Sequence, residues 1–107
     1  MLRDNIKGGA LTEVTFFILL SLYKPKHGYA IMQFIEDETK GRLILGAGSL
    51  YGAINSMLDK KWIEPFGDDN HRKKEYIITS LGKEINKREK KRLNEIIEIA
   101  SRIMEEV

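Results

Sequence analysis

The last quarter of the sequence is patterned as one long helix with an apolar face. Thr79 suits a helix N-cap, and the helix expected after it runs from about Ser80 to near the C-terminus, roughly 25 residues. In its second half, apolar residues recur at helical spacing: Leu93, Ile96, Ile97, Ala100, Ile103, Met104 and Val107. So small a domain cannot bury this whole face. We therefore expect these residues to hold a homodimer. The alternative is that they pack against the chain's own domain, which is plausible for Leu93 but explains the residues from Ile103 onward poorly.

Length and composition exclude several classes of protein. The 107 residues suffice for one domain, and 42% hydrophobic residues is too many for a disordered chain. The net charge of +2 is too small by itself to indicate nucleic-acid binding. Cysteine is absent, which excludes disulfides and thiolate metal sites. No signal-peptide pattern is present, and the apolar run Val14–Leu22 is far shorter than the roughly 20 residues that span a bilayer. We expect a cytoplasmic protein without membrane contact or cofactor.

The rest of the pattern predicts a mainly α chain with a small β hairpin. Three helices are expected before the long one, over residues 11–22, 28–39 and 50–61. The first is apolar nearly all round and should be buried on more than one side, and the third has Ser49 as its expected N-cap. Strands are expected over residues 42–45, 62–66 and 74–79, with Pro65 near a sheet edge.

No catalytic constellation is evident in the sequence. His27 and His71 lie in expected turns, and nothing marks a nucleophile elbow. Gly46 and Gly48 are not followed by the Gly-Lys-Ser/Thr of a phosphate-binding loop. We therefore do not expect an enzyme.

The order of helices favours a helix-turn-helix. In that motif the second helix of the pair lies in the major groove of DNA, with its N-terminal residues on base edges. The candidate DNA-contacting residues of the third helix are Ser49, Tyr51, Gly52, Asn55 and Ser56. Asn55 can make a bidentate contact with adenine, Ser49 and the free N–H groups of the helix start can hold a phosphate, and Gly52 lets a backbone come close. Taken singly, these residues are equally well explained as solvated polar positions.

A basic hairpin tip strengthens the DNA-binding hypothesis. His71, Arg72, Lys73 and Lys74 follow an acidic turn between the two expected strands. A basic hairpin directly after a recognition helix is the plan of a winged helix, whose tip contacts phosphates or enters the minor groove. The alternative, a sheet edge protected by lysines, fits the order of elements less well. A second basic run, Lys87–Arg92, is better explained as a solvated helix face.

An ordered set of motifs resembles the PadR family of transcriptional regulators. The motifs are His27-Gly28-Tyr29, Gly48-Ser49-Leu50-Tyr51, Trp62-Ile63 and Tyr76-Ile77-Ile78-Thr79 with Gly82, and they cover residues 11–107. The resemblance implies a winged helix-turn-helix that dimerises mainly through its C-terminal helix, assisted by the first. It also implies promoter-DNA binding, usually as a repressor released by a small effector. By analogy, Tyr29, Ser49, Tyr51 and Arg72 to Lys74 would lie at or near DNA.

Several positions depart from the family pattern. Gly52 stands where proline is common, Ser56 where arginine is common, Leu58 where glutamate is frequent and Lys61 where glycine is frequent. The serine at 56 removes one expected contact or ion pair, so the base preferences of the family do not transfer. The only tryptophan, Trp62, precedes the wing, so binding of flat aromatic compounds through a tryptophan of the last helix is not supported.

These observations predict a flexible arm over residues 1–10, a winged helix-turn-helix over 11–80 and a dimerisation helix over 81–107. The function expected is a homodimeric repressor of transcription that binds double-stranded promoter DNA and is released by a small effector. The alternative is a winged-helix protein–protein interaction module without DNA binding, and a small-molecule binder is a third.

Overall fold

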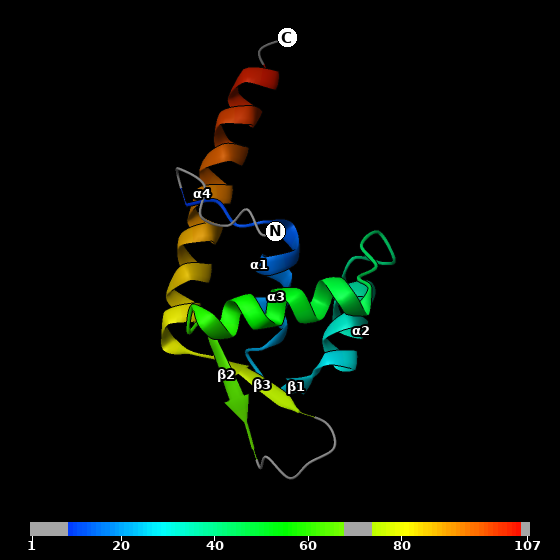
Figure 1. Ribbon diagram of the computed structural model, residues 1–107. Helices are drawn as coiled ribbons and strands as arrows, with labels where there is room; N and C mark the ends of the chain where they lie inside the picture. Colours follow the sequence, from blue (N-terminus) through cyan, green and yellow to red (C-terminus); the bar gives the residue numbers. More distant parts are fainter. Residues whose placement is uncertain (1–8, 68–73, 106–107) are drawn as a thin grey trace.

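The computed structural model describes residues 9–67 and 74–105. In this part of the chain it contains helices α1 (Glu13–Ser21), α2 (Gly28–Glu38), α3 (Ala47–Asp59) and α4 (Ser80–Met104) (Figure 1). Three short strands complete it: β1 (Lys26–His27), β2 (Ile63–Phe66) and β3 (Glu75–Ile78). The fold is thus mainly α with a small antiparallel sheet, as predicted.

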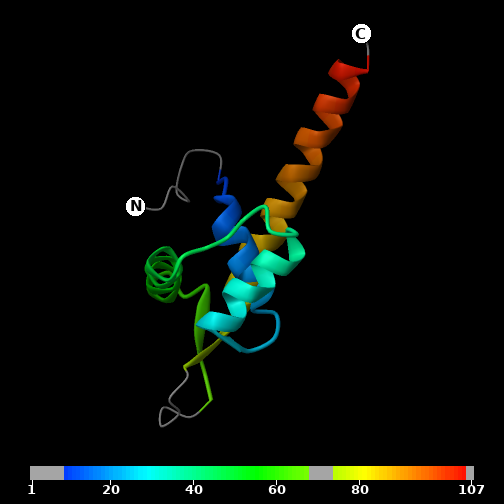
Figure 2. The same cartoon turned by 90° about the vertical axis from the view of Figure 1, so that its right-hand side faces the viewer.

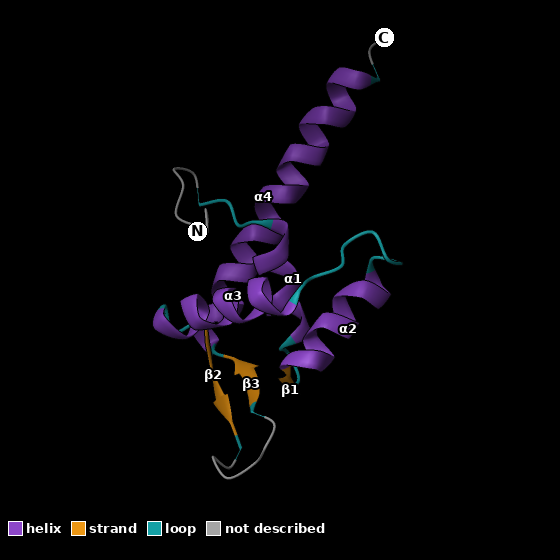
Figure 3. Ribbon diagram, turned by 45° about the vertical axis from the view of Figure 1, so that its right-hand side comes forward, coloured by secondary structure: helices purple, strands orange, loops and turns teal. Residues whose placement is uncertain are grey.

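The sheet has the strand order β1-β3-β2 and extends below the helices (Figure 3). Strands β2 and β3 pair with Ile63 opposite Ile78 and Pro65 opposite Tyr76, which confirms the hairpin. Strand β2 is an edge strand, as expected for a strand that contains Pro65, because proline has no N–H for a second neighbour. Strand β1 fills the other edge of β3, with Lys26 opposite Tyr76.

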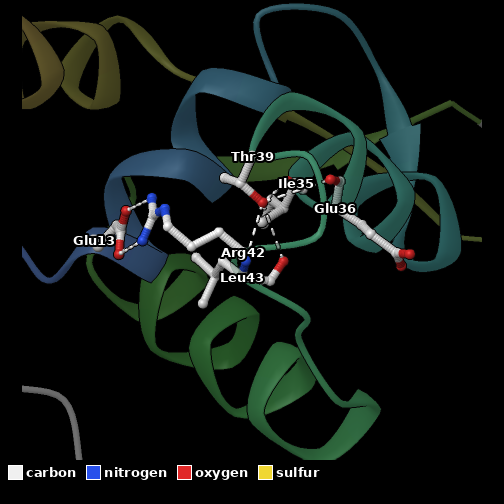
Figure 4. A network of polar contacts seen from close by, with 6 residues as sticks. All are labelled: Glu13, Ile35, Glu36, Thr39, Arg42 and Leu43. Atoms are coloured by element: carbon white, nitrogen blue, oxygen red, sulfur yellow. Dashed lines mark hydrogen bonds and ion pairs between the residues drawn. The ribbon is translucent and has the colours of Figure 1, made fainter.

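The strand expected over residues 42–45 is wrong, because local hydrogen bonds hold this segment as an irregular connection. The Leu43 N–H donates to Thr39 Oγ1 (3.1 Å), and the Thr39 hydroxyl donates to the Ile35 carbonyl at the end of α2 (2.8 Å). The Arg42 guanidinium pairs with the Glu13 carboxylate at the start of α1 (Figure 4). The third strand is instead the two-residue segment β1, which is too short to give a periodic signal.

Side chains at three helix starts satisfy backbone donors. Thr12 Oγ1 accepts from the Thr15 N–H (3.1 Å), His27 Nδ1 from the Ala30 N–H (3.4 Å), and Thr79 Oγ1 from the Gly82 N–H (3.0 Å). The Thr79 cap is therefore confirmed. Ser49 as the cap of α3 is wrong: the Gly46 carbonyl accepts from the Leu50 N–H (3.0 Å), so the helix begins at Ala47 and Ser49 lies inside its first turn.

Helix α1 lies at the centre of the domain and contacts both α2 and α4. Its Thr15, Ile18, Leu19 and Ser21 are buried, which agrees with the prediction from its apolar composition. The hydrophobic core gathers residues from every helix before α4 and from the hairpin: Ile18, Leu19, Leu22, Ile31, Ile35, Leu50, Ile54, Met57, Trp62, Ile63, Tyr76 and Ile78.

Helix α4 begins in the core and then leaves it (Figure 2). Gly82, Asn86 and Glu89 are buried, and the domain's longest dimension, 58 Å, follows from the projecting helix. The Glu89 carboxylate accepts from the Arg92 guanidinium (2.6 and 2.9 Å). These hydrogen bonds lower the pKa of Glu89 against the opposing effect of burial, and the Leu11 backbone N–H lowers it further. One buried carboxylate therefore ties α4 to the residues just before α1.

Candidate nucleic-acid interface

The exposed side of α3 carries the five residues predicted to contact DNA. Ser49, Tyr51, Gly52 and Asn55 are exposed and Ser56 is half-buried, while Leu50, Ala53, Ile54 and Met57 are buried on the opposite side. We call the five residues Ser49, Tyr51, Gly52, Asn55 and Ser56 the α3 face. The buried side packs on α2 and β2, so the core sets the rotation of α3 about its axis. The structure therefore brings these residues together on one surface.

The backbone at the start of α3 is open to close approach. Its N-cap, Gly46, supplies no side-chain hydrogen bond, and no acidic residue occupies the first turn. A Cβ atom added at Gly46, Gly48 or Gly52 would meet no other atom within 4 Å. The free N–H groups can therefore donate hydrogen bonds to an anion such as a phosphate, and the positive end of the helix dipole attracts it.

Tyr29 lies at the start of α2 and is the more exposed of the two tyrosines predicted near DNA, 66% against 45% for Tyr51. Its ring stacks on the ring of His27, with the centroids 6.5 Å apart and an interplanar angle of 19°. His27 was not among the site residues predicted from the sequence. Its position just before a helix was the available signal, because a residue there can cap the helix with its side chain.

Tyr51 does not extend freely from α3. A Cβ atom added at Gly28 would overlap the Tyr51 hydroxyl oxygen and would lie 2.8 Å from Tyr51 Cζ, so the end of the ring covers the Gly28 backbone. Burial raises the pKa of Tyr76, and the nearby Tyr51 raises it further. The Tyr51 side chain thus covers the first turn of α2 and lies near the central strand.

The predicted basic tip is only partly within the structure. Lys74 is exposed next to the start of β3, whereas His71, Arg72 and Lys73 lie outside the described residues. The hairpin extends beyond α3 (Figure 1), with Phe66 exposed at the end of β2.

The connection between α2 and α3 is held in its first half, next to α2. The Glu13–Arg42 ion pair lowers the pKa of Glu13, first through its hydrogen bond, and raises that of Arg42 in the same way. Both side chains are largely exposed, so the pair contributes little to stability. Together with the Thr39 hydrogen bonds, it orients the segment that leads into α3 (Figure 4).

The second half of α4 exposes a broad apolar surface. Ile96, Ile97, Ile103 and Met104 are exposed, Leu93 and Ala100 are half-buried, and Val107 lies outside the described residues. Ile99, which was not among the residues predicted to hold the dimer, is also exposed and widens the surface. We call the residues Leu93, Ile96, Ile97, Ile99, Ala100, Ile103 and Met104 the distal α4 face.

No group of three or more His, Asp or Glu side chains in residues 9–67 and 74–105 could hold a metal ion. Within the same ranges, no helix is long and apolar enough to cross a membrane.

The fold is that of winged-helix transcriptional regulators, a class of proteins that are not enzymes. More particularly, the chain belongs to the PadR-like family of transcriptional regulators, whose family model matches residues 18–88. This confirms the resemblance noted in the sequence.

Relatives agree in sequence and in fold. "Uncharacterized protein X" of Lysinibacillus sphaericus is 32% identical, over 98% of this chain and 97% of that protein. A PadR family transcription regulator from Clostridium difficile R20291 superposes with a TM-score of 0.72 at 20% identity, over 87% of this chain and 99% of that chain. A second, from Eggerthella lenta, gives a TM-score of 0.71 at 17% identity, over 86% and 81% of the two chains.

Proposed function

We propose that this regulator is a cytoplasmic repressor that binds promoter DNA as a homodimer. The observation that carries the proposal is the α3 face: polar side chains and open backbone gather on the exposed side of a helix whose other side is anchored in the core. In this arrangement Asn55 and Ser56 approach base edges, Ser49 and the first N–H groups of α3 meet a phosphate, and Gly52 allows a close approach.

The remaining predicted contacts flank the α3 face. Tyr29 approaches the DNA backbone from the start of α2, and the wing residues His71, Arg72, Lys73 and Lys74 contact phosphates. Residues 11–80 therefore form the DNA-binding unit in this proposal, preceded by the arm at 1–10.

The distal α4 face supports the homodimer. All of its large side chains except Leu93 are exposed in the single chain, and each contributes about 1.5–3 kcal/mol when buried, before the entropy of association is subtracted. A two-fold dimer held by residues 81–107 would present two α3 helices to two half-sites. We include release by a small effector in the proposal because the family resemblance implies it.

Replacing Arg72, Lys73 and Lys74 together by alanine tests the wing. We expect affinity to fall almost uniformly for the preferred site and for random duplex. The slope of log affinity against log salt should become shallower by roughly one for each lost phosphate contact. The preferred site is first obtained by selection from a random DNA pool, and affinity is then measured across a salt series.

The control for the wing variant is Lys87, Lys90 and Lys91 replaced by alanine. This variant removes the same charge from exposed positions of α4, which rises away from α3 and the hairpin (Figure 2). Its salt slope should stay that of the wild type. If the wild type binds no duplex even at low salt, repression through DNA is wrong, and the protein-interaction module becomes the better hypothesis.

Replacing Gly52 by alanine should separate stability from DNA binding. Because a Cβ there meets nothing within 4 Å, the higher helix propensity of alanine should raise the free energy of unfolding by about 0.5–1 kcal/mol. The added methyl would stand between α3 and the DNA, so affinity should fall. Urea unfolding and fluorescence anisotropy measure the two effects, with Asn94→Ala on α4 as a control that should leave DNA affinity unchanged. Unchanged affinity in Gly52→Ala would contradict the close approach.

A further inference from the structure

The junction of α2, α3 and β3 is built around one exposed side chain, Tyr51. Gly28, the first residue of α2, is buried because the Tyr51 ring covers it. A Cβ at Gly28 would overlap the Tyr51 hydroxyl oxygen and would also lie 3.2 Å from Leu50 Cδ2. The absence of a side chain at residue 28 therefore makes room for the tyrosine.

The third member of the junction is the central strand. Tyr76 of β3 lies opposite Lys26 of β1, which ends one residue before Gly28. The pKa of Tyr76 is raised first by burial and then by the neighbouring Tyr51. The Tyr51 ring therefore lies over the first turn of α2 and near the central strand.

The position of this contact along α3 gives it a role in recognition. Tyr51 lies in the N-terminal half of α3, the half that a helix-turn-helix places on base edges. Productive contacts require side chains held within about 0.5 Å by their supporting residues. Leu50 and Ile54 anchor the buried side of α3, and Tyr51 adds a contact on its exposed side.

We infer that Tyr51 is a positioning residue that fixes α3 against the first turn of α2 and thereby sets selectivity for the preferred DNA site. This inference rests on the proposed function. It differs from the expectation drawn from the family, in which Tyr51 lies at DNA as a contact. A contact through the hydroxyl would act on phosphates and affect all sequences alike.

Two substitutions at residue 51 distinguish positioning from contact. Tyr51→Phe keeps the ring over Gly28 and removes only the hydroxyl, so affinities for the preferred site and for random duplex should both stay within about threefold of wild type. Tyr51→Ala removes the ring, so affinity for the preferred site should fall about tenfold or more, the scale of one lost base contact, while affinity for random duplex changes little. Both are measured on full-length protein at a temperature where circular dichroism shows each variant folded.

Substitution of Gly28 tests the same contact from the opposite side. Gly28→Ala retains the Tyr51 hydroxyl but displaces the ring, so it should lose selectivity as Tyr51→Ala does. In the double variant Gly28→Ala/Tyr51→Ala, the added methyl no longer meets the ring. Its remaining tight contact, 3.2 Å to Leu50 Cδ2, is with the end of a flexible side chain, so Gly28→Ala should cost little further. Alanine is a better helix former than glycine, so helix propensity cannot explain a loss.

Three results would overturn the inference. One is an equal loss by Tyr51→Phe and Tyr51→Ala on both DNAs, which indicates a hydroxyl–phosphate contact. Another is unchanged selectivity in folded Tyr51→Ala or, if that variant does not fold, in Gly28→Ala. The third is additive effects of the two alanine substitutions. A wild type that binds no duplex refutes the proposed function, and the inference with it, without any variant.

Discussion

Replacing Ile96 and Ile103 together by glutamate is expected to convert the proposed dimer into monomers. Both side chains are exposed in the single chain, 46% and 55%, so the substitution should leave the domain folded. In the dimer it would place four carboxylates, two from each chain, in an apolar interface, where each unpaired charge costs several kcal/mol. Sedimentation equilibrium should give the mass of one chain. Affinity for a two-half-site DNA should fall by orders of magnitude, because the second half-site is no longer tethered.

The matched control is Asn94→Glu with Ser101→Glu. These two residues are also exposed and seven positions apart on α4, but they lie outside the apolar stripe. The control adds the same charge to the same helix, so it should remain a dimer. Should the Ile96 and Ile103 variant sediment as a dimer, the distal α4 face is not the interface.

Replacing Gly82 by alanine is expected to cause the largest loss of stability from a single methyl group. A Cβ at this position would overlap the Trp62 carbonyl oxygen and lie 2.7 Å from Ile78 Cγ1. The same carbonyl accepts a hydrogen bond from the Thr79 N–H (3.0 Å), so it cannot move without breaking that bond. We expect the free energy of unfolding to fall by about 3 kcal/mol, the upper end of overpacking costs.

Urea unfolding at one fixed protein concentration measures this loss, since a dimer's apparent stability depends on concentration. Gly52→Ala is the internal comparison, because it adds the same methyl to another helix of the chain where nothing opposes it. A Gly82→Ala protein as stable as the wild type would show that α4 can shift away from β2 at no cost. In that case the junction would not be rigid.

Local sequence pattern predicted the elements that depend on neighbours in the chain. Thr79 caps α4 because its hydroxyl reaches an N–H only three residues away. Pro65 marks the edge strand because it lacks a donor whatever its surroundings. The members of the α3 face share a side because helical periodicity alone decides which residues lie together.

Contacts between distant residues escaped prediction. Helix α3 begins three residues earlier than expected, with Gly46 and not Ser49 as its N-cap. The connection before it is held by Thr39 and by the Glu13–Arg42 pair, and Glu13 is remote from Arg42 in sequence. Strand β1 forms by pairing with the edge of β3 that β2 leaves free. Two residues are too few to give a strand pattern in the sequence.

By itself, the sequence determined the class of fold, the family, and which residues of α3 and α4 are left exposed, since periodicity and motif order depend on the chain alone. Only the tertiary structure decided which residues from distant parts of the chain are in contact. It placed the Tyr51 ring on Gly28, the Trp62 carbonyl against Gly82, and a buried Glu89 beside Leu11. Such contacts depend on the packing of elements far apart in sequence, and the free energy of that packing belongs to the folded domain as a whole.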